Sequence, residues 1–122
     1  MIFNNTSFIY DILKMKLIKV EKLVKTMKYV YNWYVKASQE GIKKMISDNK
    51  YGPNWVAKVK EVCKKAGVKL LFVGSPFGTA EQYVVGIESD HALDEFYKVT
   101  GELYRIDPAM IEYAKTEIIL VM

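Results

Sequence analysis

The stretch from Tyr29 to Val35, which reads YVYNWYV, places the strongest constraint on the fold. All of its residues except Asn32 are β-branched or aromatic, the composition typical of a β-strand. Because side chains alternate along a strand, one face carries Tyr29, Tyr31, Trp33 and Val35, and the other carries Val30, Asn32 and Tyr34. Both faces are largely apolar. We therefore expect a central strand with a layer on each side, and a polar partner or a cavity beside the Asn32 amide.

Length and composition indicate one globular domain with one core. The chain has 122 residues, 51% of them apolar, and charges of both signs are scattered along it. It contains no run near the ~20 apolar residues of a membrane span, and no secretory signal pattern. Cys63 is the only cysteine, which excludes an internal disulfide and a cysteine-based zinc cluster. We expect a cytoplasmic protein that does not bind to membranes.

The positive charge is concentrated near the N-terminus. Residues 1–26 contain five lysines and two acidic residues, a net charge of +3, whereas residues 27–122 carry only +1 of the total of +4. Nucleic-acid binding usually needs a basic stripe on the folded domain, so we expect no nucleic-acid partner. The charge distribution and the pattern divide the chain into an N-terminal extension, 1–26, and a domain, 27–122.

The extension is predicted to form an amphipathic helix from Tyr10 to Thr26. Its apolar residues recur at three- and four-residue spacings between lysines: Ile12, Leu13, Leu17, Val20 and Val24. Such a helix packs on its own domain or on a partner. A membrane-surface role is less favoured because the stripe has no aromatic anchor after Tyr10. A third interpretation is that Met27 is the natural start of the protein.

Helices and strands alternate along the domain. Ser38 is predicted to cap a helix with Ile42, Met45 and Ile46 on its apolar side, and Asn54 to cap a second helix that ends at Gly67. Segments 68–73 and 82–88 have the pattern of a β-hairpin. Asp90 is expected to cap a further helix whose inner face carries Leu93, Phe96, Tyr97 and Val99 or Thr100. Asp107-Pro108 should open a short helix to about Ala114, before a last strand from Thr116 to Met122.

The element order β-α-β-β-α-β predicts an α+β protein with the ferredoxin-like fold and an antiparallel sheet. We expect its first and third strands to be central and parallel to each other, and its helices to cover one face. The other face would then expose large apolar side chains of the first strand, more than a monomer usually tolerates. Either the N-terminal helix or a second copy of the sheet should cover it.

Residues 27–122 resemble the dimeric α+β barrel superfamily. The resemblance rests on the element order, on the aromatic first strand that follows Met27-Lys28, and on the acidic residue that opens the later helix. It implies a homodimer in which two sheets pack face to face. The superfamily includes cofactor-independent and haem-degrading monooxygenases, isomerases, ligand-sensing domains and small families of unknown role. This chain looks most like the last group.

Candidate site residues are few. Asn32 and Tyr34 of the central strand are expected on the floor of a pocket between the sheet and the helices, with His91, the only histidine, near its entrance. Such a pocket would bind a small aromatic or apolar molecule. The alternative is that Asn32 faces the dimer interface. One histidine without a second ligand at helical spacing does not predict a metal site, and no cofactor is expected.

Two other function classes remain open. Haem-degrading relatives use an Asn on the first strand, a Trp on a later strand and a His on a helix; Asn32 and His91 match two of these, but no later strand contains a Trp. A cofactor-independent monooxygenase would orient a phenolic substrate with Asn32, Trp33, Tyr34 and Tyr83. A non-enzymatic structural or ligand-sensing homodimer is the rival, and the sequence does not decide whether the protein is an enzyme.

Overall fold

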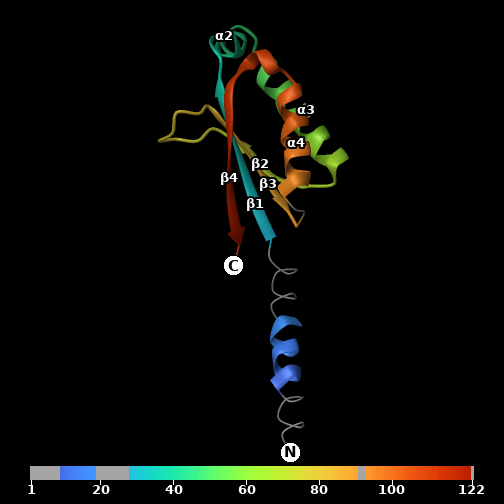
Figure 1. The fold of residues 1–122 in the computed structure, drawn as a ribbon. Coiled ribbons are helices and arrows are strands. Elements are labelled where there is room, and N and C mark those ends of the chain that lie inside the picture. The colour runs from blue at the N-terminus through green and yellow to red at the C-terminus, as the bar shows by residue number, and fades with distance from the viewer. Residues whose placement is uncertain (1–8, 19–27, 91–92, 122) are drawn as a thin grey trace, which may run out of the picture.

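The computed structural model describes residues 9–18, 28–90 and 93–121. Residues 9–18 form an N-terminal helix. The domain then runs β1 (Lys28–Ala37), α2 (Gln39–Ser47), α3 (Tyr51–Ala66), β2 (Lys69–Gly74), β3 (Tyr83–Ser89), α4 (Leu93–Arg105), the 3₁₀ turn η1 (Pro108–Met110) and β4 (Ile111–Val121). The four strands form one antiparallel sheet in the order β2-β3-β1-β4, and α3 and α4 lie on one side of it (Figure 1).

This order confirms the ferredoxin-like fold, with β1 and β3 in the centre of the sheet. The expectation that these two strands run parallel is wrong, because they pair antiparallel over Tyr29–Val35. The reason lies in the connections. The crossover through α2 and α3 brings β2 back parallel to β1, and the hairpin that follows reverses the chain, so β3 must run opposite to both.

Strand β1 buries its more aromatic face against the helices. Tyr31, Trp33 and Val35 are each 3% exposed or less, and the ring of Tyr31 stacks on Phe96 of α4 with 3.9 Å between the ring centroids. From α3, Trp55, Val59 and Cys63 complete this core. Burial raises the pKa of the Cys63 thiol, so the residue stays a neutral core side chain, as the sequence predicts.

The first crossover contains two helices, as the sequence predicts. Ser38 caps α2, because its hydroxyl oxygen accepts the backbone N–H of Gly41 at 3.0 Å. The cap expected at Asn54 is wrong. Helix α3 already begins at Tyr51, because Pro53 fits its first turn, where an N–H group is not required. Gly67 ends α3 in the left-handed conformation, with φ 70°, as expected.

The C-terminal elements differ from the prediction. Helix α4 buries Phe96, Val99 and Leu103, whereas Tyr97, expected inside, is 65% exposed; the side chain of Leu93 lies outside the described residues. The helix expected after Asp107 is a single 3₁₀ turn, and β4 begins at Ile111, before the expected Thr116. Pairing along the whole of β1 explains the early start, since β1 offers hydrogen-bonding partners as far as Ala37.

A partly buried polar contact joins α2, α3 and the turn before β4. The Asp107 carboxylate oxygen Oδ2 accepts the Tyr51 hydroxyl at 2.6 Å and the Lys44 ammonium at 3.3 Å. These contacts, that of Tyr51 first, hold the pKa of Asp107 below its ordinary value of 3.8. A carboxyl with a lowered pKa in the folded state stabilises the fold above the unfolded value, and this stabilisation is lost as the pH falls through the folded value.

We therefore expect Asp107→Asn to flatten the acid limb of the stability profile. The free energy of unfolding of the parent protein should fall more steeply below pH 3.8 than that of the variant. At pH 7, Tyr51→Phe should destabilise by about 1–2 kcal/mol, because a charge-assisted hydrogen bond is lost. Urea unfolding between pH 2 and pH 7 measures both, with Glu112→Gln as an exposed control. Identical acid limbs for the parent protein and Asp107→Asn would contradict this interpretation.

Candidate functional site

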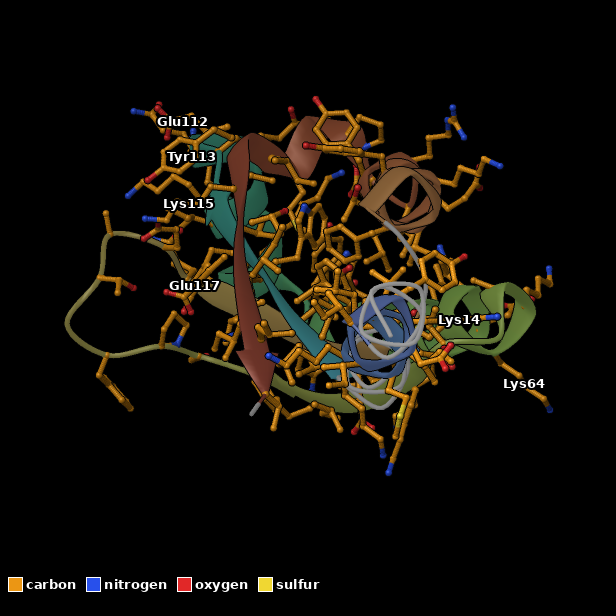
Figure 2. The ribbon with its side chains drawn as sticks, turned by 60° about the horizontal axis from the view of Figure 1, so that its bottom comes forward. Lys14, Lys64, Glu112, Tyr113, Lys115 and Glu117 are labelled. Atoms are coloured by element: carbon orange, nitrogen blue, oxygen red, sulfur yellow. The ribbon has the colours of Figure 1, made fainter. Side chains whose placement is uncertain are left out.

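The sheet has a face that no described helix covers, here called the open face. Directly paired residues of antiparallel strands lie on the same face, so the strand register assigns its members. They are Lys28, Val30, Asn32, Tyr34 and Lys36 of β1; Val84, Gly86 and Glu88 of β3; Tyr113, Lys115, Glu117, Ile119 and Val121 of β4; and Lys69, Phe72 and Gly74 of β2. Tyr113, Lys115 and Glu117 extend from β4 on the side away from α3 (Figure 2).

Three polar side chains meet in the middle of this face. The Glu117 oxygen Oε1 accepts hydrogen bonds from Asn32 Nδ2 at 3.2 Å and from the Tyr34 hydroxyl at 3.3 Å. The other end of the Asn32 amide, Oδ1, is buried and accepts no hydrogen bond from any described residue. A buried amide oxygen normally accepts a hydrogen bond, so a donor group is expected beside this one.

A charged pair borders this polar cluster. Lys115 Nζ lies 2.6 Å from Oε1 of Glu81, a side chain with only 1% exposure, and 5.6 Å from the centre of the Tyr34 ring. Lys115 lowers the pKa of Glu81, and Glu81 raises the pKa of Lys115, so both groups are charged at neutral pH. Burial, and then Glu117, raise the pKa of Tyr34. The phenol therefore stays protonated and acts as a hydrogen-bond donor.

Apolar side chains surround the polar cluster. The Phe72 ring lies directly over Gly86, where any added Cβ would overlap it. Phe72 is nevertheless 45% exposed, Ile119 42% and Val121 48%. The loop between β2 and β3 extends beyond the sheet on the side away from the helices (Figure 1), and its Phe77 is 98% exposed. The open face therefore combines aromatic and aliphatic contact area with a few hydrogen-bonding groups, the usual composition of a small-molecule site.

Two of the site residues predicted from the sequence do not lie on the face of the sheet where they were expected. Asn32 and Tyr34 do lie together, but on the open face. The expected pocket between sheet and helices with these two residues on its floor is therefore wrong, because Tyr31, Trp33 and Val35 occupy the helix side of β1. His91 lies outside the described residues. Sequence reasoning missed Glu117, Lys115 and Glu81. A strand starting at Ile111 would have placed the first two on the same face as Asn32.

The described residues contain no group of three or more His, Cys, Asp or Glu side chains arranged to hold a metal ion. None of their helices is long and apolar enough to cross a membrane.

Comparison with known proteins gives a likeness of fold. No family model matches the chain, and no curated protein matches it. A crystal structure of a NipSnap family protein of unknown function from Agrobacterium tumefaciens is similar, with 18% identity, a TM-score of 0.46, and coverage of 78% of this chain and 87% of that one. A second structure from that organism has 17% identity and a TM-score of 0.43, covering 75% and 90% of the two chains. The de novo designed protein Ferredog-Diesel has 14% identity and a TM-score of 0.38, covering 75% and 84%.

Proposed function

We propose that this protein is a homodimer that binds a small aromatic molecule between its two sheets, with the open face serving as both interface and site. The observation that carries the proposal is the Asn32 amide. Its Nδ2 is engaged by Glu117, its buried Oδ1 accepts no described hydrogen bond, and exposed apolar side chains lie around it.

The character of the open face supports pairing with a copy of itself. Phe72, Ile119 and Val121 expose much of their apolar surface on one face, which a monomer rarely leaves in water. Two of the neighbouring lysines are already neutralised within one chain: Lys28 pairs with Glu88 at 3.0 Å, and Lys115 with Glu81 at 2.6 Å. These two pairs therefore add no large like-charge repulsion between two copies related by a twofold axis.

The Asn32 amide oxygen defines the chemistry of the ligand. Buried as it is, Oδ1 costs about 1–3 kcal/mol if it meets no donor. A ligand with a hydroxyl or amino group supplies that donor, and an aromatic body suits Tyr34 and Phe72. Because Glu117 already accepts two hydrogen bonds and carries the local negative charge, an anionic ligand is disfavoured. A neutral phenol is the class that fits best.

We expect 2-naphthol to bind at least tenfold more tightly than 2-methylnaphthalene, a tenfold ratio being about 1.4 kcal/mol. Asn32→Leu, which keeps the side-chain size and removes the amide, should abolish this preference. Lys36→Gln, on the same face outside the polar cluster, should preserve it. Thermal-shift titration followed by calorimetry measures the affinities.

Equal affinities for the two compounds, or a preference that survives Asn32→Leu, would refute the proposed site. A dimer that binds neither compound would instead favour a structural homodimer in which the partner subunit supplies the donor to Asn32.

A further inference from the structure

A groove between α3 and α4 lies on the other side of the domain from the open face. It encloses about 790 Å³, within the range of ~300–1,000 Å³ usual for small-molecule sites. Its apolar surface comes from Val62 and Val68 on one side and from Phe96, Val99 and Ile106 on the other. Phe96 and Val99 are anchored in the core, with 3% and 5% exposure, so this part of the groove is built on rigid packing.

The charged side chains that line this interhelical groove differ in whether they form ion pairs. Lys65 is paired with Glu61 at 3.2 Å, and Arg105 is paired with Glu102. Lys58 and Lys98 also line the groove, and neither forms an ion pair with a side chain that the structure describes, which leaves out those of residues 93–95. Two such cations beside an apolar surface complement a molecule with an anionic head and an apolar body.

We propose that the interhelical groove binds a single-chain anionic amphiphile, a free long-chain fatty acid. Its alkyl chain would lie along Val62, Val68 and Ile106, which are only half-buried, and its carboxylate would be held by Lys58 or Lys98. Burial of the chain supplies most of the binding free energy, at roughly 25 cal/mol per Å² of apolar surface. The lysines supply selectivity for the anionic head. This site is separate from the open face and does not depend on the function proposed for that face.

The basic N-terminal helix is a poorer occupant of the groove. Its described part, residues 9–18, carries Lys14 and Lys16 on an exposed helix, so docking would bring like charges to Lys58 and Lys98. A small anion meets no such repulsion.

Fluorescence titration of the full chain with cis-parinaric acid tests the proposal. We expect the probe to bind, palmitate to displace it, and hexadecylamine, which has the same chain length and the opposite charge, to leave it bound. Lys58→Gln combined with Lys98→Gln should weaken palmitate binding about tenfold. The matched control, Lys60→Gln with Lys64→Gln, makes the same charge change on exposed α3 positions outside the groove and should leave the affinity unchanged.

A second variant tests the location of the chain. Ala66 is exposed at the edge of the groove, so Ala66→Trp fills the space without disturbing the core and should abolish palmitate binding while circular dichroism stays unchanged. Asn32→Leu should bind palmitate like the parent protein, which separates this site from the open face. The proposal is overturned if parinaric acid does not bind, if hexadecylamine displaces it as well as palmitate does, or if the control pair loses as much affinity as the groove pair.

Discussion

Ile119→Glu is expected to convert the proposed homodimer into a monomer. Ile119 lies on the open face of β4, opposite Val30 of β1, and is 42% exposed in the single chain. In a twofold interface each copy would bury the new carboxylate next to Glu117, without a cationic partner. An uncompensated buried charge costs several kcal/mol, and the interface would contain two of them. Light scattering at about 10 µM protein should show the mass fall from twice 14.1 kDa to 14.1 kDa.

The adjacent residue provides a matched control. Leu120 is 41% exposed on the same strand, but it pairs with Tyr29 and therefore faces the opposite side of the sheet. Leu120→Glu changes charge and size in a comparable way and should remain dimeric. If Leu120→Glu dissociates the protein and Ile119→Glu does not, the interface lies on the other face. If the parent protein is itself monomeric at this concentration, the proposed homodimer is refuted.

The same experiment tests the role of the N-terminal extension. Every residue of the described helix, 9–18, is exposed, including Ile9, Leu13 and Leu17, so these residues add no buried apolar area to the domain. We propose that residues 1–26 are dispensable for the fold. A chain that begins at Met27 is then expected to have twice its own, smaller chain mass in light scattering and to unfold cooperatively.

The central position of β1 could be predicted from the sequence. Which of its two faces packs against the helices could not. A strand with apolar residues at both parities belongs inside a sheet, and this prediction is confirmed. Which parity meets the helices depends on packing between distant residues, such as the stacking of Tyr31 on Phe96, which local patterning does not encode. Because the sequence does not determine which face of β1 meets the helices, Asn32 and Tyr34 were expected in a pocket beneath the helices, whereas they lie on the open face.

The ends of elements were predictable where a local hydrogen bond or backbone conformation determines them. The Ser38 cap and the left-handed Gly67 are of this kind, and both are confirmed. The start of β4 is not, because its first residues become a strand only by pairing with β1. The residues missed at the site follow from the same cause, since Lys115 and Glu117 gain their neighbours from the pairing of β4 with β1.

Gly41→Ala is expected to destabilise the domain by about 2 kcal/mol, because the new methyl group has no space. A Cβ at Gly41 would lie 2.7 Å from both the side-chain Cγ and the backbone oxygen of Met110. Met110 is 1% exposed, and its carbonyl oxygen accepts the Ser38 N–H at 2.7 Å, so neither atom can move without breaking the junction between α2 and η1. This steric cost outweighs the ~1 kcal/mol by which alanine favours a helix over glycine.

Gly101→Ala in α4 is the matched control, and its effect should have the opposite sign. A Cβ at Gly101 meets no atom within 4 Å, so only the helix preference remains, and we expect stabilisation by about 0.5–1 kcal/mol. Urea unfolding of the three proteins at one fixed concentration, followed by tryptophan fluorescence, measures both changes. Gly41→Ala with the stability of the parent protein would show that α2 can move away from Met110, and that the close contact between α2 and η1 does not hold the turn in front of β4.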